Sequence, residues 1–305
     1  MRPFLSICIP TFNRIEKLEY NICKLIKLHE TCEFEICVSD NASNDGTNEF
    51  MLKMVSRYNF IKYNQNSENF GWTYNFDYVL NMANGQYRWL LGDDDEVTEI
   101  EQVVETLKEY KPDICVINGS NIIKNMHSKI MYDKNEILSK LGVIMSWIST
   151  LIISDLVVKR INIKNVNNNA FPHLIEILKF LDKQCNLYWL NIPAVDTQKS
   201  YQNRYHDDIF NYFIRDWYNV TLNIGSYNES SKNEFLNAVI RRAFSLRSIV
   251  LLRIENIINR KSCEKVKKEL ENFPIRFRIC IFIIKFIPIL FLKNIVRLYK
   301  QIKLF

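Results

Sequence analysis

The chain has 305 residues, 48% hydrophobic and 24% charged with a net charge of +6; this composition excludes a disordered protein and allows one full core plus an appended segment. Its eight cysteines include no Cys-x-x-Cys pair and lie mostly in apolar stretches, so we expect reduced thiols rather than a disulfide framework or a zinc site. The first apolar run begins almost directly after Met1, which leaves no room for a signal peptide and predicts a cytosolic domain.

Strand-like and helix-like patterns alternate along the first part of the chain. Apolar runs predict strands at 5–10, 34–38, 60–63 and 87–91, and helical periodicity predicts helices at 15–29 and 72–83. This order is typical of an α/β fold with a mainly parallel sheet. No Gly-x-Gly-x-x-Gly follows the first strand and no phosphate loop ends in Lys-Ser or Lys-Thr, which disfavours an ordinary dinucleotide or ATP site.

Polar residues collect directly after these predicted strands. They include Thr11, Asp40, Asn69 and the acidic triplet 93–95. In an open α/β sheet the carboxyl ends of the strands form the ligand crevice, so we expect these side chains to converge.

The acidic triplet Asp93, Asp94 and Asp95 follows Gly92 at the end of an apolar run. Neighbouring carboxylates raise one another's pKa unless a cation neutralises them, and hard divalent ions prefer oxygen ligands of this kind. The triplet therefore predicts a metal site. A solvated acidic turn or a helix N-terminus is the alternative interpretation, and the triplet alone does not decide between them.

Four motifs in the first 120 residues occur in a fixed order. They are Ser-Ile-Cys-Ile-Pro-Thr-Phe-Asn-Arg at 6–14, Val-Ser-Asp-Asn-Ala-Ser-Asn-Asp-Gly-Thr at 38–47, Asn-Phe-Gly at 69–71, and the segment from Asn-Gly-Gln-Tyr to Leu-Gly-Asp-Asp-Asp at 84–95. In order and spacing they resemble the signatures of family 2 glycosyltransferases of the GT-A fold. The resemblance implies a nucleotide-diphospho-sugar transferase fold with a mixed, mainly parallel sheet and flanking helices, and sugar transfer with inversion, normally with Mn or Mg.

Carried over by position, the resemblance implies a role for each matching residue. Thr11 and Asp40 would hold the nucleobase and Asp93 would face the ribose. Asp94 and Asp95 would be the metal ligands, with Asp94 the one that touches the diphosphate. The other donor-binding candidates on the same motifs are Pro10, Asn13, Arg14 and Asn69. The family more often has Leu-Asp-x-Asp-Asp, whereas Gly92 takes the first acid position here, so which two of the three acids act stays open.

Inversion also needs a base that takes the proton from the acceptor hydroxyl. The family usually places a Glu-Asp pair at the start of a later helix, where this chain reads Ala-Phe-Pro-His-Leu-Ile-Glu at 170–176. Pro172 is a good first helical residue, so His173 is the candidate base, with Glu176 one turn further on. A packed or capping histidine is the alternative, and Asp155 and Asp196 are reserve carboxylates.

Segment 146–153 resembles the strand that lines the acceptor side in these enzymes. Within it, Trp147 could stack on a sugar face or belong to the core.

The C-terminal part differs in charge. Residues 241–305 contain 16 Lys and Arg against 4 Glu, a local net of +12, whereas the first 240 residues carry a net of −6. Helical patterns cover 207–223 and 232–259, and the 14-residue apolar stretch 279–292 is too short and too interrupted for an ordinary span of about 20 residues. Its basic flanks predict a segment in the headgroup plane of an anionic cytoplasmic leaflet, and a helix pair packed on the catalytic domain or a second subunit is the alternative. The tail is too apolar for a nucleic-acid arm.

We therefore expect a GT-A catalytic domain at 1–200, with nucleotide-sugar binding at 1–120 and the acceptor side at 121–200. A helical basic region with a membrane-interfacial end follows at 201–305. The expected reaction moves a sugar, most simply from a UDP-sugar, to a hydroxyl of a growing lipid-linked bacterial surface glycan at the inner face of the cell membrane. A sugar nucleotidyltransferase is disfavoured because the loop after the first strand lacks a Gly-rich, Arg-containing sequence. A non-catalytic membrane-associated scaffold stays open because the Glu-Asp counterpart is weak.

Overall fold

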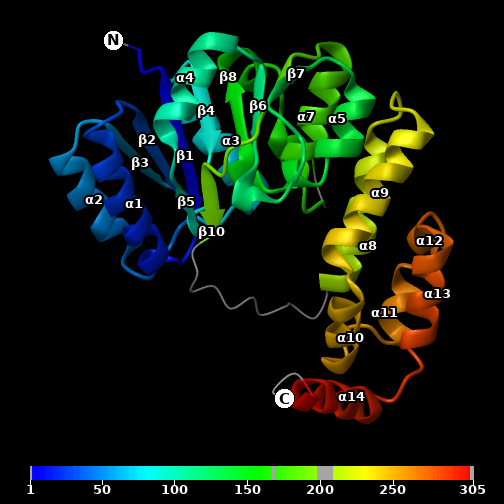
Figure 1. The fold of residues 1–305 in the computed structure, drawn as a ribbon. Helices are drawn as coiled ribbons and strands as arrows, with labels where there is room; N and C mark the ends of the chain where they lie inside the picture. Colours follow the sequence, from blue (N-terminus) through cyan, green and yellow to red (C-terminus); the bar gives the residue numbers. More distant parts are fainter. Residues whose placement is uncertain (1, 167–168, 198–208, 303–305) are drawn as a thin grey trace. The chain divides into compact units, whose positions relative to one another are not determined.

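An eight-stranded sheet is the centre of the first of two units in this computed structural model (Figure 1). The structure describes residues 2–166, 169–197 and 209–302. Unit 1 comprises residues 1–137, 144–168 and 172–202, and unit 2 comprises 138–143, 169–171 and 203–305. The predicted domain boundary between residues 200 and 201 lies outside the described residues.

The sheet is mixed and mainly parallel on its N-terminal side, as the sequence predicts. Its strand order is β3-β2-β1-β4-β8-β6-β9-β7. The strands are β1 (Leu5–Thr11), β2 (Glu35–Asp40), β3 (Ile61–Gln65), β4 (Tyr87–Leu90), β6 (Ile114–Ile117), β7 (Lys129–Met131), β8 (Leu151–Ser154) and β9 (Leu187–Leu190). A separate two-stranded sheet pairs β5 (Asp95–Val97) with β10 (Val195–Thr197).

Parallel pairing brings the ends of three strands to one edge. Strand β1 pairs in parallel with both β2 and β4, and Thr11 at the end of β1 lies opposite Asp40 at the end of β2. Loops that leave these strands therefore begin side by side, although they are far apart in the sequence.

Helices cover the sheet. They are α1 (Ile15–His29), α2 (Thr47–Arg57), α3 (Trp72–Met82), α4 (Ile100–Tyr110), α5 (Lys134–Leu141), α6 (Asp155–Val158) and α7 (Pro172–Lys183). Helix α1 has exactly the predicted bounds, and α3 ends one residue earlier than predicted. Segment 146–153 is only partly a strand, because the short 3-10 helices η2 (Ile144–Ser146) and η3 (Ile148–Thr150) precede β8.

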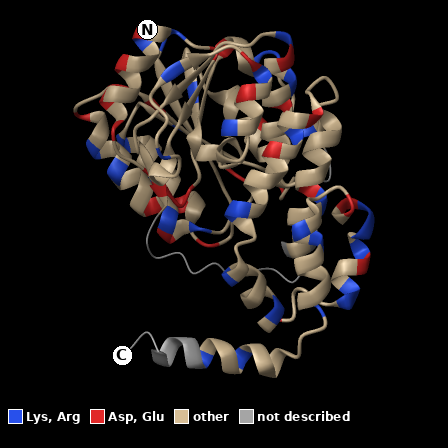
Figure 2. Cartoon of the chain, turned by 45° about the vertical axis from the view of Figure 1, so that its right-hand side comes forward, with Lys and Arg blue, Asp and Glu red and all other residues tan. Residues whose placement is uncertain are grey.

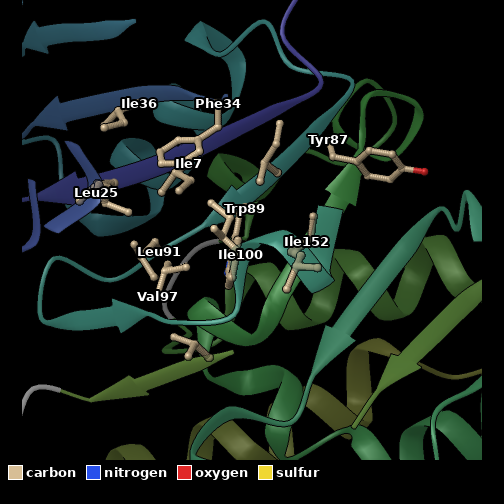
Figure 3. Close-up of a cluster of buried hydrophobic side chains, with 14 of the residues drawn as sticks. Ile7, Leu25, Phe34, Ile36, Tyr87, Trp89, Leu91, Val97, Ile100 and Ile152 are labelled. Atoms are coloured by element: carbon tan, nitrogen blue, oxygen red, sulfur yellow. The ribbon is translucent and has the colours of Figure 1, made fainter. Parts of the chain in front are cut away.

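The main core of unit 1 lies between the sheet and its helices. Strands β1, β2 and β4 are buried along their whole length, which explains why they read as continuous apolar runs rather than as alternating patterns. Figure 3 shows Trp89 of β4 among side chains from β1, α4 and β8. Its indole nitrogen donates a 2.8 Å hydrogen bond to the Ser149 carbonyl, so one of the two fully buried tryptophans also holds the turn before β8.

Unit 2 is helical and has an aromatic core. Its helices after residue 208 are α8 (Ile209–Asn223), α9 (Glu229–Ala243), α10 (Leu246–Ile254), α11 (Arg260–Lys265), α12 (Lys267–Leu270), α13 (Ile275–Ile284) and α14 (Ile289–Ile302). The rings of Trp217 and Phe235 lie 5.4 Å apart and those of Phe244 and Phe277 lie 5.1 Å apart, measured between centroids. These contacts join α8, α9 and α13 into one packed body.

The continuous helical pattern predicted at 232–259 is wrong. The structure ends α9 at Ala243 and begins α10 at Leu246, because the Ser245 side chain accepts a hydrogen bond from the Ser248 N–H and caps a new helix. The first two residues of the predicted helix 207–223 lie outside the described residues.

Among the described residues, no single helix combines the length and apolarity needed to cross a membrane. One pair, α13 with the first part of α14, meets that test by length and composition only, and it is bent by 102°.

Glu35 ties together the strands that lead to the sheet edge. Its buried carboxylate accepts hydrogen bonds from the Ser6 hydroxyl at 2.6 Å and the Asn84 N–H at 2.9 Å, and it pairs with the Lys62 ammonium at 2.5 Å. Burial alone would raise the pKa of Glu35, but the Asn84 N–H, Lys62 and Ser6 together lower it below the ordinary value. The Glu35 carboxylate therefore takes up a proton less readily in the folded protein than in the unfolded chain. Its contacts stabilise the fold at pH values above the ordinary pKa of glutamate, and this stabilisation is lost as the pH falls through the lowered pKa.

We expect Glu35→Gln to lower the free energy of unfolding by roughly 1.5–3 kcal/mol at neutral pH, because three charge-assisted contacts are weakened. The difference from wild type should shrink toward about pH 4. Urea unfolding at both pH values measures it. Glu33→Gln, at an exposed position two residues upstream, is the matched control and should unfold like wild type. An equal loss of stability in both variants would contradict the role of Glu35.

Candidate active site

A cavity of about 470 Å³ opens at the shared edge of β1, β2 and β4. Six of the residues singled out from the sequence line it: Pro10, Thr11, Arg14, Asn69, Asp93 and Asp94. Five others do not: Asn13, Asp40, Asp95, His173 and Glu176. The cavity is also lined by Asn41, Trp72, Asn75 and Phe76, which are not among the residues predicted from the sequence. Their place in the sequence could have identified them. Asn41 directly follows Asp40, and the other three lie on the first turns of α3, just after the Asn-Phe-Gly motif.

Asp93 and Asp94 face the cavity together and share one cationic partner. A single Arg14 guanidinium nitrogen lies 2.9 Å from Asp93 Oδ1 and 3.3 Å from Asp94 Oδ2. The Thr11 hydroxyl donates to the other Asp93 oxygen at 2.8 Å. Burial raises the pKa of Asp93, whereas Arg14 and Thr11 act to lower it. A positive charge between these two carboxylates is therefore needed to keep both of them ionised.

The loop that carries Arg14 is tied to the loop after β2. Asn13 adopts a left-handed conformation with φ of 52°, which is uncommon for a residue other than glycine. Its N–H donates to the Ser43 hydroxyl at 2.8 Å, and its side-chain oxygen accepts from the Asn44 N–H at 2.9 Å. Asn13 thus positions Arg14 without lining the cavity itself.

Asp95 points away from the cavity. Its carboxylate accepts hydrogen bonds from the Trp147 indole N–H at 2.6 Å and from the Ser149 hydroxyl, and only 4% of the residue is exposed. Burial raises the pKa of Asp95 to about 6, against the lowering effect of Ser149 and Trp147. The expectation that Asp95 is a metal ligand stays untested, and the geometry makes Asp93 and Asp94 the pair that faces the cavity.

The glycine at position 92 follows from this arrangement. A Cβ atom on Gly92 would lie 2.8 Å from Asp95 Oδ2, and the Gly92 N–H donates to the Ser149 hydroxyl at 2.8 Å. An aspartate at position 92 would compete with the inward-turned Asp95 for the same space. The inward orientation of Asp95 therefore requires a residue without a side chain at position 92.

Asp40 is fully buried and its oxygens are engaged within the protein. One oxygen accepts from the Ser43 N–H at 2.9 Å and from its hydroxyl, and the other accepts from the Tyr63 hydroxyl at 2.9 Å. Burial and the nearby Asp40 raise the pKa of Tyr63 well above its ordinary value. The nucleobase contact expected for Asp40 stays untested, and in this structure Asp40 shapes the loop that presents Asn41.

Asparagine side chains form one wall of the cavity. The Asn41 amide donates to the Asn69 side chain at 2.6 Å, and its oxygen accepts from the Phe70 N–H at 3.1 Å. Asn75 donates to the Ser39 carbonyl at 2.9 Å and accepts from the Ser39 hydroxyl at 2.6 Å. These bonds connect β2 with the start of α3, so the wall is held by both the sheet and the helix.

His173 and Glu176 lie on α7 and do not reach the cavity. His173 is 3% exposed, and its Nε2 hydrogen-bonds the Ser146 carbonyl at 3.0 Å. Burial lowers the pKa of His173 to about 4, so the imidazole is neutral at physiological pH. Its ring packs behind Phe76, whose centroid lies 6.2 Å away. Glu176 accepts from the Asn162 N–H at 3.0 Å and pairs with Lys179.

The two reserve carboxylates differ in environment. Asp155 pairs with Lys159 at 2.6 Å and with Arg88 and Arg2 at 2.9 Å each. Burial by itself would raise the pKa of Asp155, but these cations lower it to about 2. So low a pKa suits a structural ion pair and not a base. Asp196 is exposed on β10 and accepts from the Ser120 hydroxyl.

The residues present can hold a divalent cation with help from a ligand. Within the described ranges there is no cluster of three or more His, Cys, Asp or Glu side chains arranged as a metal site. Asp93 and Asp94 supply two carboxylates at the cavity. Magnesium is commonly bound by one or two protein carboxylates plus phosphate oxygens and water, so this donor set fits such an ion.

The part of the chain that carries the site matches a known family. The sequence model described as glycosyl transferase family 2 matches residues 6–151, which cover β1 to β6 and the acid triplet. These residues are thus similar to family 2 glycosyltransferases over just under half of the chain. The predicted resemblance and the GT-A fold class are thereby confirmed.

Two curated relatives match part of the chain. The chain is 30% identical over 217 residues to the abequosyltransferase RfbV of Salmonella typhimurium, covering 63% of this chain and 65% of the relative. It is 31% identical over 146 residues to the GalNAc(5)-diNAcBac-PP-undecaprenol beta-1,3-glucosyltransferase of Campylobacter jejuni, covering 45% of this chain and 47% of that protein. The matches thus span under two thirds of either relative.

The fold has a counterpart in solved structures. The crystal structure of Staphylococcus aureus TarS 1–349 in complex with UDP-GlcNAc superposes with a TM-score of 0.59 at 18% identity, over 90% of this chain and 82% of that chain. At this identity the likeness shows the shared fold.

We expect Asp94→Asn and Asp95→Asn to separate a metal ligand from a buried structural carboxylate. Asp95→Asn should lower the free energy of unfolding by about 1–3 kcal/mol, because the Trp147 and Ser149 donors lose a charged acceptor. Asp94→Asn should leave unfolding unchanged but weaken Mn²⁺ binding in the presence of UDP about tenfold or more.

Urea unfolding and Mn²⁺-dependent water-proton relaxation measure the two effects. Loss of Mn²⁺ binding in Asp95→Asn with unchanged unfolding would restore Asp95 as a ligand.

Proposed function

We propose that the protein is an inverting, metal-dependent glycosyltransferase that moves a sugar from a nucleotide diphosphate sugar to a hydroxyl of a lipid-linked bacterial surface glycan. One observation carries the proposal: Asp93, Asp94 and Arg14 meet at the carboxyl ends of β1 and β4 in the part of the chain that matches family 2. The adjoining cavity of about 470 Å³ has the size of a small-molecule site.

Asp94, with Asp93 beside it, would hold a Mn or Mg ion, and that ion would stabilise the charge that develops on the leaving diphosphate. Arg14 supplies a fixed positive charge at the same place and can donate to phosphate oxygens once a donor occupies the cavity. Thr11 keeps the buried Asp93 carboxylate oriented through its hydroxyl. The Asn41, Asn69 and Asn75 wall offers neutral hydrogen-bonding groups for the uncharged part of the donor.

UDP-sugar is the first donor to test. TarS, which shares the fold, was solved in complex with UDP-GlcNAc. The lipid-linked acceptor is supported by the Campylobacter relative, whose name places its substrate on PP-undecaprenol. Such an acceptor is anchored in a membrane, so we further propose that the protein works at the inner face of the cell membrane.

Asp196 ranks ahead of the residues of α7 as the base because it is an exposed carboxylate; like His173 and Glu176, it does not line the cavity. Asp196 lies opposite Glu96 in the β10–β5 pair, and β5 begins with the last residue of the acid triplet. His173 was the candidate from the sequence, and as a base it would need to leave the layer behind Phe76. Its position supports a packing role that holds the Ser146 turn.

A non-catalytic scaffold is the second candidate, because neither His173 nor Glu176 lines the cavity. Hydrolysis of a nucleotide sugar by the purified protein separates the two candidates, since a scaffold releases no nucleotide.

We expect Mn²⁺-dependent release of UDP from at least one UDP-sugar, and loss of that release in EDTA. Asp94→Asn should lower the rate about 100-fold or more, because the leaving diphosphate loses most of its charge compensation. Glu99→Gln, at an exposed position a few residues downstream, is the control and should retain wild-type activity. Unchanged release in EDTA or in Asp94→Asn would refute the metal-dependent transferase.

For the base, we expect Asp196→Asn to lower kcat for donor hydrolysis about 100-fold with UDP affinity unchanged. His173→Gln should lower kcat less than about tenfold and should melt at a lower temperature, because a buried, neutral imidazole is replaced in a packed layer. Steady-state kinetics, calorimetry with UDP and thermal melts measure these effects. The reverse ranking would return the role of base to His173.

A further inference from the structure

Helix α13 is apolar on two opposite faces. Its inner face carries Phe277, Ile281 and Ile284, which are at most 5% exposed and pack in the core of unit 2. Its outer side carries a second row at the same helical spacing: Ile275, Ile279, Phe282 and, just past the helix end, Phe286, exposed by 63%, 52%, 60% and 48%. A helix at the surface of a protein in water normally presents polar residues there. The outer row therefore calls for a partner.

Helix α14 continues this apolar surface. The two helices are bent by 102° at a short break that contains Pro288, which has no N–H to continue the helix. We call the outer apolar face the set of exposed large apolar residues of this region: Ile275, Ile279, Phe282, Ile283, Phe286, Leu290, Phe291 and Ile295. Contiguous apolar surface of this kind marks an interaction site in a soluble protein.

Cations border the face and acids are missing from it. Residues 272–305 contain seven Lys and Arg and no Asp or Glu. In Figure 2 the last helix is drawn with blue and tan segments and no red. The Lys285 ammonium lies 4.8 Å from the centre of the Phe282 ring, and the Arg260 guanidinium lies 4.8 Å from that of Phe286. The positive charge is thus held at the edge of the exposed aromatic rings.

A groove leads inward from the outer row. A cavity of about 450 Å³ lies between α13 and the segment of α11 and α12. Its lining combines apolar side chains of the outer row with three cations and two glutamates; the cations are Lys267, Arg278 and Lys285. Three cations against two glutamates leave this lining a net charge of +1, so the groove mainly extends the apolar surface, which suits the acyl chain of an amphiphile.

We infer that the outer apolar face docks on an anionic phospholipid surface, with its Ile, Leu and Phe side chains among the acyl chains and its cations at the phosphates. Charge complementarity selects this occupant. A second copy of the chain would oppose two faces of the same positive charge, and a nucleic acid would leave the apolar side chains unburied. The bend of 102° fits a segment that lies in the interface better than a straight span.

The inference rests on α13, α14 and the neighbouring residues of α11 and α12, and only its link to a lipid-linked acceptor rests on the proposed function. Membrane docking of this face would bring the protein to the surface in which such an acceptor is anchored. Vesicle binding and donor hydrolysis are measured separately, so failure of one leaves the other standing.

The test is co-sedimentation of the full-length protein with vesicles of phosphatidylcholine alone or mixed with phosphatidylglycerol. We expect binding only to the mixed vesicles, and release when NaCl rises from about 0.1 M to about 1 M. Phe282→Ser and Ile279→Ser should each weaken binding about tenfold, and Lys285→Gln about fivefold. Because these side chains are exposed or lie at the rim, the variants should keep the wild-type melting temperature.

Leu222→Ser is the matched control, since it removes an exposed leucine of α8 that lies outside the outer apolar face. It should bind vesicles like wild type. Absence of binding to mixed vesicles, or wild-type binding by Phe282→Ser and Ile279→Ser, would overturn the inference. Concentration-dependent dimers that Phe282→Ser abolishes, without vesicle binding, would assign the face to a second copy and overturn it as well.

Discussion

The site depends on one buried charge, the carboxylate of Asp93. It is 4% exposed and lies at the end of β4, between the Thr11 hydroxyl and the Arg14 guanidinium from the end of β1 and the start of α1. A carboxylate in this position is stable only with a positive partner and hydrogen-bond donors. The parallel pairing of β1 with β4 brings Thr11 and Arg14 within reach of Asp93. The electrostatics of the cavity therefore depend on the topology of the sheet.

The neighbouring acids show how one loop divides its charges. Asp94 shares Arg14 and faces the cavity, whereas Asp95 turns inward to Trp147 and Ser149. The absence of a Cβ at Gly92 leaves room for that inward turn. The loop is thereby attached to the turn before β8, which His173 also holds through the Ser146 carbonyl. The cavity wall that contains Ile148 is therefore positioned from behind by residues that do not line it.

Unit 2 has both a packed aromatic core and an exposed apolar face. Its aromatic core accounts for the inner face of α13, but the side chains of the outer apolar face stay about half exposed or more. Acidic residues end at Glu271, just before this face begins. The separation of an acidic N-terminal part from a basic, apolar C-terminal part fits the proposal that the protein transfers sugar from a soluble donor to a membrane-anchored acceptor.

The sequence by itself determined the strand and helix order, the mainly parallel sheet and the resemblance to family 2 glycosyltransferases, because buried parallel strands read as apolar runs and the polar motifs follow their ends. It also placed Thr11, Arg14, Asn69, Asp93 and Asp94 at one site. Which way each side chain turns was decided only by tertiary structure. Asp40, Asp95 and His173 have partners that are distant in sequence or on another strand, namely Tyr63, Trp147 with Ser149, and Ser146. Sequence spacing fixes where a residue stands on its own strand or helix, whereas its orientation depends on contacts that form only when separate elements pack.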